Sequence, residues 1–252
     1  MENTSASVSN VDKVVLSKSS NKIKGKLNKL VSMLFAPIWF AKLHKKKFIF
    51  IAQDAHRVNY DGKRYNRFFD ILIDKYGLEN DSLYFEKTTA HSKKVERNHL
   101  LRDYDKALAV AVKRFRMKKI TNHHFENDGY KMFLSYLEAH PQTKDFVSKY
   151  TEEKLSKWYS QTAIPKILFF KKVLRKIAPE QIMILCYYSE NIMLLLAAAN
   201  ELNIKTIEMQ HGPQSPLHLC YASWGLVPND GYGVLPRTYW CWDIESKSTI
   251  DE

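Results

Sequence analysis

The sequence predicts an α/β fold in which helices cover both faces of a parallel sheet. Three short apolar runs, at 48–52, 181–187 and 204–209, each end in a polar segment, as buried strands do. Between the last two runs, residues 190–202 are apolar on most sides, which is typical of a helix packed against a parallel sheet. Strand, helix and strand in this order predict a βαβ unit and a doubly wound sheet.

The remaining elements of the domain follow from the same periodicities. After a polar loop at 53–57, apolar residues recur at helical spacing over 66–75, and Gly77 is placed to end that helix. Residues 82–86 are a further strand candidate. From 95 to 177 the pattern is almost wholly helical, which predicts a helical insertion attached to the sheet domain.

The two ends of the chain differ in composition from the predicted domain, which covers 48–243. Residues 1–20 are rich in Ser and Asn and bury too little apolar surface to offset the entropy of ordering, which predicts a disordered tail. Residues 244–252 are predicted to begin a linker.

A basic amphipathic segment is predicted at 21–47. Its lysines flank an apolar centre that contains Trp39, which suits a segment lying in the interface of an anionic membrane. A basic helix packed on its own domain is the alternative. The apolar run 31–43 contains Pro37 and is shorter than the roughly 20 residues that cross a bilayer.

The charge balance limits the classes of partner. Lys and Arg number 39 against 27 Asp and Glu, so the formal net charge of +12 favours an anionic membrane or phosphate-bearing molecules. The cations are spread along the chain without a nucleic-acid motif, so nucleic acid is not expected. Three widely spaced cysteines are typical of free thiols in a reducing compartment. His123 and His124 are adjacent and lack a third ligand at metal-binding spacing, so no metal is expected.

Candidate functional residues gather after the last predicted strand. Gln210, His211 and Gly212 follow it directly, with His218 and Tyr221 close behind. Residues beyond the carboxyl ends of parallel strands face ligands, and histidine can bond to a substrate or titrate near neutral pH. His211 is therefore the leading candidate for catalysis, with its neighbours binding substrate. Gly212 permits a positive φ or the close approach of a ligand.

A second polar group is expected at the same edge of the sheet. Asp54, His56 and Arg57 follow the first strand, so we expect this loop to lie within reach of His211 and to bind substrate with it. Glu208 has apolar neighbours in its strand. Either it pairs with a backbone donor or a base, which we prefer, or its pKa is raised into the range of an acid/base catalyst.

Several of these residues resemble a known group of enzymes. The run 207–212, followed by His218, Tyr221 and the aromatic residues at 239–242, resembles bacterial glycosyltransferases of the two-domain GT-B fold that build capsule and lipopolysaccharide. The run 66–70 (Asn-Arg-Phe-Phe-Asp) is also similar to that group. The resemblance is strong over 180–243 and weak in the helical middle.

The resemblance implies that the chain is the Rossmann-like, acceptor-side half of such an enzyme. The nucleotide sugar would bind a second domain, which would follow the linker or belong to a separate chain. Gln210, His211 and Gly212 would face the cleft between the two domains. It further implies that no cofactor is needed and that the acceptor is a surface glycan or a lipid-linked one. The chain would be cytoplasmic and peripheral to the inner membrane. Two alternatives stay open: a non-catalytic module that binds a glycan or a partner, and a polyol-phosphate transferase of the same fold.

Overall fold

Two compact units, Met1–Lys42 and Leu43–Glu252, make up the chain. The computed structural model describes residues 35–89, 94–117, 128–218, 220–222 and 231–251. The predicted tail at 1–20 and residues 21–34 lie outside this part, and 35–41 are helical. Residues 43–47 of the predicted basic segment belong to the second unit instead. Leu43 is buried there, and the Lys46 amide donates to the Ile177 carbonyl at 3.0 Å.

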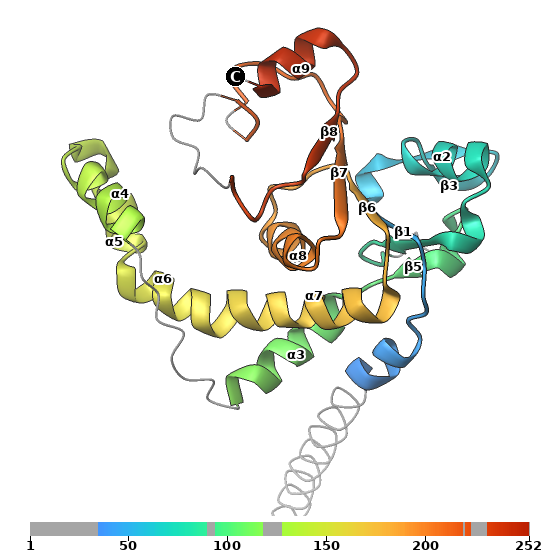
Figure 1. Ribbon diagram of the computed structural model, residues 1–252, viewed down its shortest axis with the longest axis horizontal. Helices are drawn as coiled ribbons and strands as arrows, with labels where there is room; N and C mark the ends of the chain where they lie inside the picture. Colours follow the sequence, from blue (N-terminus) through green and yellow to red (C-terminus); the bar gives the residue numbers. More distant parts are fainter. Residues whose placement is uncertain (1–34, 90–93, 118–127, 219, 223–230, 252) are drawn as a thin grey trace, which may run out of the picture. The chain divides into compact units, whose positions relative to one another are not determined.

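A six-stranded parallel sheet forms the centre of the second unit and confirms the predicted α/β class (Figure 1). Its strands are β1 (Phe48–Ile51), β4 (Ser82–Phe85), β5 (Leu101–Arg102), β6 (Gln181–Ile184), β7 (Lys205–Met209) and β8 (Thr238–Trp240). Their spatial order is β5-β4-β1-β6-β7-β8, and every neighbouring pair is parallel. Counted along the chain this is the order 3-2-1-4-5-6 of a Rossmann-like sheet.

One face of the sheet packs on α2 (Phe69–Tyr76). Side chains from three strands, Phe50, Tyr84 and Met183, meet Phe69 and Ile73 of the helix in one buried cluster. The rings of Phe50 and Phe69 lie 4.9 Å apart. Because successive side chains of a strand alternate between faces, the neighbours of these strand residues point to the opposite face.

The opposite face is covered by α3 (Asp105–Met117), α7 (Ile164–Ile177) and α8 (Glu190–Glu201). Phe85 follows Tyr84 in β4, and its ring lies 5.5 Å from Tyr104, which lies 5.5 Å from Phe170 of α7. The helix α8 crosses from β6 to β7, as the predicted βαβ unit requires. Ser189 holds its N-cap position, although the serine side chain makes no cap hydrogen bond.

A β-hairpin that was not predicted lies between β1 and α2. It follows the short helix η1 (Asp54–His56) and pairs β2 (Arg57–Tyr60) with β3 (Lys63–Asn66). The turn residues Asp61 and Gly62 have φ of 47° and 75°, which is the preferred backbone for a two-residue hairpin turn. The helix predicted over 66–75 therefore begins later, at Phe69.

Both ends of α2 have a local cause. The Asn66 side-chain oxygen accepts hydrogen bonds from the amides of Phe68 and Phe69 at 3.0 and 2.9 Å, so it supplies acceptors at the start of the helix. Gly77 ends the helix as predicted, with a φ of 62° that glycine adopts without a steric penalty. The short helix η2 (Glu79–Asp81) then leads into β4, which confirms the strand candidate at 82–86.

The insertion predicted at 95–177 is the connection between β5 and β6, but its first residues belong to the sheet. Here η4 (Asn98–Leu100) leads into β5. The helical part contains α3, α4 (Asp128–Glu138), η5 (Pro141–Thr143), α5 (Lys144–Lys149), α6 (Glu152–Trp158), the π-helical turn η6 (Tyr159–Ala163) and α7. Figure 1 shows α4, α5 and α6 at the end of α7 that is distant from the sheet.

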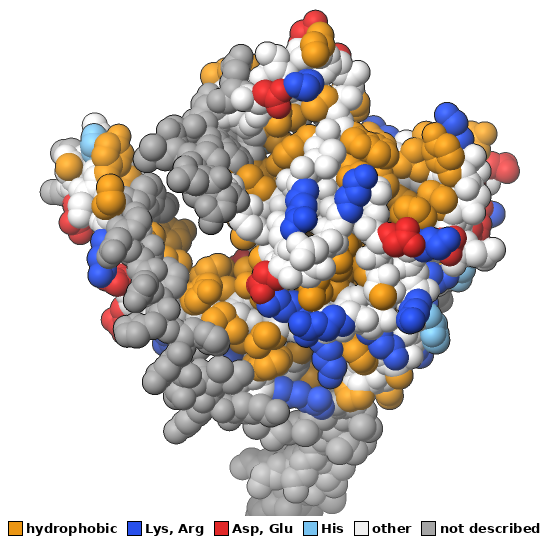
Figure 2. All heavy atoms as spheres, in the orientation of Figure 1, with side chains coloured by type: hydrophobic (Ala, Val, Ile, Leu, Met, Phe, Trp, Pro, Cys, Tyr) orange, Lys and Arg blue, Asp and Glu red, His pale blue; other side chains and the backbone are white. Residues whose placement is uncertain are grey.

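The carboxyl-terminal part corrects the expected linker at 244–252. Residues 238–240 add β8 to the sheet, and 244–251 form the helix α9 (Ile244–Asp251). Figure 2 shows Lys and Arg side chains scattered over one face of the molecule, several of them over α7, and apolar side chains gathered near α9.

Candidate functional site

The candidate site lies at the carboxyl edge of the sheet, around the end of β6. The chain leaves β1 toward β4 on one side and leaves β6 toward β7 on the other, so β1 and β6 flank the point where the strand order reverses. Ligands of open α/β sheets bind outside the strands at this point. The loops after β1, β6 and β7 are therefore the segments positioned to contact a ligand.

His56 and His211 face each other at this edge. His56 ends η1 after β1, His211 follows β7, and their ring centroids are 5.7 Å apart at an interplanar angle of 69°. Both side chains are half-buried. The Nδ1 atom of each ring is buried and has no hydrogen-bond partner within the described residues. The predicted meeting of these two loops is confirmed, whereas the catalytic role of His211 stays a prediction.

Arg67 extends this pair into a cluster of cationic groups. Its amide donates to the His56 carbonyl at 3.3 Å, and its guanidinium carbon lies 5.0 Å from the centroid of the Phe68 ring. The edge of the same ring meets His56, at 5.7 Å between centroids. We call His56, Arg67 and His211 the cationic cluster.

The electrostatics of the cationic cluster are those of like charges held together. Burial lowers the pKa of His56, and the charges of His211 and Arg67 lower it further. Burial also lowers the pKa of His211, followed by the charges of His218 and Arg67. Among the described residues no carboxylate forms an ion pair with the cluster, and Asp54, the nearest one in sequence, pairs with Arg64 at 3.0 Å. Arg67 therefore supplies the permanent positive charge of the cluster, and the two imidazoles are shifted toward their neutral forms.

The predicted substrate group Tyr221 does not line this space. It is buried, and its hydroxyl donates to the Oε1 atom of Glu208, which is 1% exposed. Its ring packs edge-on against His218, 4.7 Å away, and against Tyr188, 5.9 Å away. Tyr221 thus supports the half-buried His218 and satisfies one oxygen of Glu208.

Glu208 is paired at one oxygen and also has a raised pKa. Its hydrogen-bond donor is the side-chain hydroxyl of Tyr221, a partner that was not predicted, and its second oxygen, Oε2, has no hydrogen-bond partner in the described part of the chain. Burial raises its pKa from 4.5 to about 7, and the Tyr221 hydroxyl and the Tyr187 backbone oppose this only in part. Glu208 is therefore a buried carboxyl that changes charge near neutral pH.

Gln210 is a positioning residue and not a group free to bind substrate. Its amide nitrogen donates to the Gly212 carbonyl and to the Ser246 hydroxyl, each at 3.0 Å, and its carbonyl accepts from the Trp242 amide at 2.7 Å. These bonds tie the His211 loop to β8 and α9. Gly212 has no positive φ, so that reason for a glycine does not apply. The space where a Cβ would stand is open, and the close approach of a ligand there stays a prediction.

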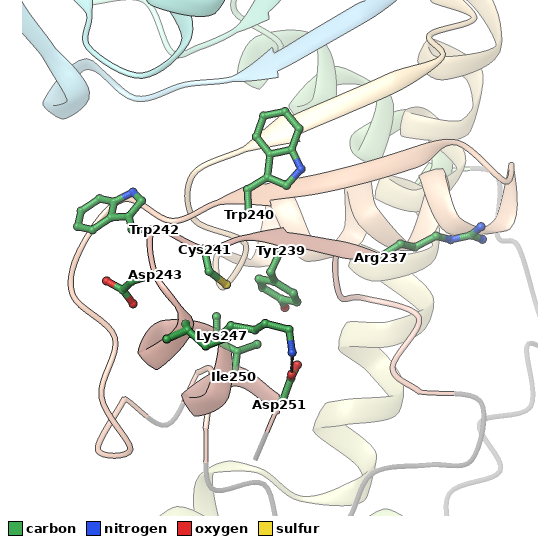
Figure 3. A pocket seen from close by; sticks show the side chains of 10 residues that line it. Arg237, Tyr239, Trp240, Cys241, Trp242, Asp243, Lys247, Ile250 and Asp251 are labelled. Carbon is green, nitrogen blue, oxygen red and sulfur yellow. Dashed lines mark hydrogen bonds and ion pairs between the residues drawn. The ribbon is translucent and has the colours of Figure 1, made fainter.

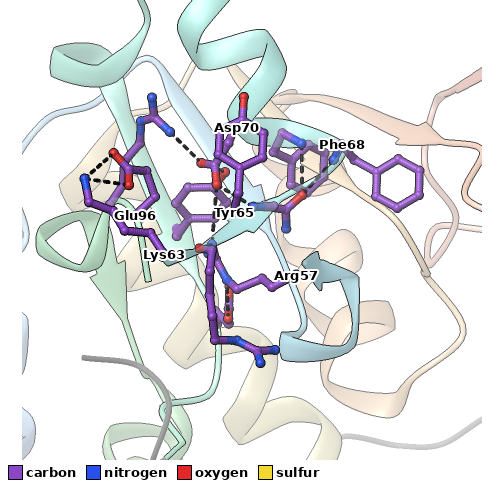
Figure 4. Close-up of polar contacts among 12 residues, drawn as sticks. Arg57, Lys63, Tyr65, Phe68, Asp70 and Glu96 are labelled. Atoms are coloured by element: carbon purple, nitrogen blue, oxygen red, sulfur yellow. Dashed lines mark hydrogen bonds and ion pairs between the residues drawn. The ribbon is translucent and has the colours of Figure 1, made fainter. Parts of the chain in front are cut away.

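Arg57 was predicted to bind substrate, but the structure buries it in an ion network (Figure 4). Its Nη2 atom lies 2.8 Å from the Glu86 carboxylate and its Nη1 atom 3.5 Å from Asp70, and all three side chains are almost completely buried. Asp70 also accepts the Tyr84 hydroxyl at 2.8 Å and pairs with Arg97 at 3.1 Å. Arg57 begins β2 and points into the domain, so it holds the hairpin in place.

A groove of about 650 Å³ lies next to the site, between β8 and α9. Figure 3 shows Tyr239 and Cys241 on the side that faces α9, with Trp240 directed to the other side of the strand. The charged groups of the groove are engaged with other residues: Lys247 pairs with Asp251, and Arg237 bonds to Asn200. The cationic cluster therefore has more buried polar side-chain atoms without a hydrogen-bond partner than the groove does, among the described residues.

Arg67 and Tyr188, whose ring packs against His218 and Tyr221, were missed as site residues. Arg67 lies in the run 66–70, which was quoted only for its resemblance, and its position one residue after a hairpin strand could not be seen without the hairpin. Tyr188 lies in the loop after the buried strand β6, four residues beyond its end, and a loop after a buried strand is the same signal that selected His211.

Comparison with family models, with curated proteins and with solved structures finds no match to this chain. Among the described residues, no three or more His, Cys, Asp or Glu side chains gather in a way that could hold a metal ion. His123 and His124 lie outside them. Within the same segments, none of the helices combines the length and the apolarity that a membrane crossing requires.

Proposed function

We propose that the chain is a glycosyltransferase of the GT-B type, or its acceptor-side half, which transfers a sugar from a nucleotide donor to a surface glycan or lipid-linked acceptor. The observation that supports it most is the approach of His56 and His211, whose ring centroids are 5.7 Å apart. They meet where the strand order of the Rossmann-like sheet reverses, which is the switch point of the sheet. The sequence resemblance over 180–243 agrees with this placement.

The side chains at the site suit both the deprotonation of the acceptor and the departure of the donor phosphate. In sugar transfer an acceptor oxygen forms a bond to the anomeric carbon, the bond from that carbon to the donor phosphate breaks, and the acceptor hydroxyl loses its proton. His211 is the proposed base, because its lowered pKa leaves it neutral and able to take that proton at pH 7. Arg67 and His56 would stabilise the charge that develops on the departing phosphate.

The proposed setting is the cytoplasmic surface of an inner membrane. The basic segment 21–42 would bring the chain to anionic lipid, where lipid-linked acceptors are found. The chain alone is expected to transfer little, because the resemblance assigns the nucleotide to a second domain and transfer needs both substrates held in reacting geometry.

A transfer assay with histidine variants tests the proposal. The full reading frame is expressed, and its membranes are given labelled nucleotide sugars, with nucleotide-activated polyols as a second donor class. His211→Ala should reduce incorporation of sugar more than tenfold, which corresponds to about 1.4 kcal/mol of transition-state stabilisation. His140→Ala, an exposed histidine on the distant helical arm, is the control and should match the unaltered protein.

Two results would contradict the proposal. Transfer of polyol phosphate in place of sugar would reassign the enzyme to the related transferase class. Full activity in His211→Ala would show that the base lies elsewhere, and loss of activity in His140→Ala to the same degree would mean that the assay reports folding.

A further inference from the structure

The cationic cluster has the properties of a site built for an anion with more than one charge. His56, Arg67 and His211 are contributed by three separate segments, η1, the residue after β3 and the loop after β7. The Phe68 ring lies between two of them, in contact with both His56 and Arg67. Arg67 carries a permanent charge beside two half-buried imidazoles whose pKa values are lowered, so a bound anion is attracted by the guanidinium charge and favours protonation of both rings.

No protein group in the described residues supplies a compensating negative charge. The acidic side chains of the neighbouring elements are engaged elsewhere: Asp54 with Arg64, Asp70 and Glu86 with Arg57. Glu208, on β7, is turned toward Tyr221 and is buried. By contrast the buried Arg57 is neutralised by carboxylates at hydrogen-bond distance, whereas Arg67 is exposed and has no carboxylate partner among the described residues. The cluster thus lacks the carboxylate partners that neutralise the ion network of Arg57, Asp70 and Glu86, as far as the described residues show.

The chemistry of the groups favours phosphate. A guanidinium and two imidazoles offer planar N–H donors that match the oxygens of a phosphate, and a dianion can bond to several of them at once. Binding also gives the imidazoles a reason to protonate, which adds charge when the ligand is present. The Nδ1 atom of each ring has no hydrogen-bond partner in the described residues and can donate to an anion when it carries the proton.

We infer that the cationic cluster is the binding site of a phosphate or diphosphate group, with Arg67 as its permanent charge and His56 and His211 as donors on either side. This inference rests on the proposed function for its choice of ligand, because two substrates of that reaction carry diphosphate. One is the nucleotide of the donor and the other is the lipid carrier of the acceptor.

Titration calorimetry with pyrophosphate on the full chain tests the site. Arg67→Gln and His211→Gln should each weaken pyrophosphate binding at least tenfold. Arg175→Gln is the matched control, because it removes the same charge from an exposed position on α7, and it should leave the affinity unchanged. Far-ultraviolet circular dichroism of each variant checks that the fold is kept, and His56→Gln serves as an independent second variant.

Two further arms identify the source of the phosphate. A nucleoside diphosphate and a water-soluble prenyl diphosphate are titrated separately, and the one that binds more tightly than pyrophosphate, with the same loss in Arg67→Gln, is the ligand carried by the site. Equal affinity for all three would assign the site to the phosphate group alone. Each of these results supports the inference.

The inference is overturned if pyrophosphate binds the Arg67, His56 and His211 variants as it binds the unaltered chain, or if Arg175→Gln weakens binding equally. The second result would show that the overall positive charge attracts the ligand. The outcome is separable from that of the proposed function. Pyrophosphate binding at the cluster without any sugar transfer by the full reading frame retains the site and rejects the enzyme, and transfer that depends on His211 without such binding does the reverse.

Discussion

Replacing Glu208 by glutamine should remove a pH dependence of stability that the buried carboxyl imposes. Glu208 is 1% exposed and its pKa is raised by burial from 4.5 to about 7. A carboxyl whose pKa is raised on folding contributes stability below its unfolded pKa and loses it as the pH rises through the folded value. The interval from 4.5 to about 7 corresponds to about 3 kcal/mol, at about 1.4 kcal/mol per pKa unit.

The glutamine variant imitates the protonated carboxyl at every pH. Its carbonyl can still accept the Tyr221 hydroxyl, and its amide takes the place of the oxygen that has no partner. The free energy of unfolding of the variant should therefore gain about 2 to 3 kcal/mol over that of the unaltered protein between pH 5 and pH 9. Urea denaturation followed by circular dichroism at several pH values measures this difference. The contributions of the other titrating groups are the same in both proteins, so they cancel in the difference.

Glu180→Gln provides the control, since Glu180 is an exposed carboxyl in the residue before β6. This variant should follow the pH profile of the unaltered protein. If Glu208→Gln also follows that profile, Glu208 is ionised without penalty in the folded protein, and the reasoning from its burial is refuted.

Three other expectations concern the network, the cluster and the amino-terminal unit. Asp70→Asn should destabilise the fold by about 3 kcal/mol in urea denaturation, because it removes a negative charge that pairs with two buried arginines. Asp74→Asn, at a half-exposed position, should cost less than about 1 kcal/mol. Equal costs would contradict this. Sulfate, a dianion throughout, should bind more tightly as the pH falls from 8 to 5, because the lowered pKa values of His56 and His211 lie below 6.5 and both rings gain charge only in the lower part of this range. Calorimetry showing constant affinity would oppose it. Removal of residues 1–42 should weaken sedimentation with anionic liposomes at low salt and leave the circular dichroism spectrum of the sheet unit unchanged; undiminished sedimentation would reject the membrane role.

The sequence reveals the central strands because burial on both faces leaves a continuous apolar run. The strands β1, β4, β6 and β7 and the helix α8 are predictable on that basis. The edge strands β5 and β8 are two and three residues long, too short for any periodicity to appear. The hairpin had a readable signal in Asp61-Gly62, which is among the strongest local signs of a two-residue turn.

The candidate site is predictable in its position and less so in its members. The rule that carboxyl ends of parallel strands share an edge brings His56 and His211 together correctly. It does not say which polar side chains are consumed by the fold. Arg57 turns to Glu86 and Gln210 bonds to Ser246, contacts across 29 and 36 residues, and such distant partners cannot be read from the local pattern.

A double-mutant cycle on His56 and His211 tests most directly whether they form one ligand site at the switch point. Pyrophosphate affinity is measured by calorimetry for the unaltered chain, for His56→Gln, for His211→Gln and for the double variant. Residues that hold one ligand together should show an interaction energy of at least about 0.5 kcal/mol, so that the double variant departs from the sum of the single effects. Two single variants that each bind as the unaltered chain does, or losses that add without interaction, would contradict a shared site.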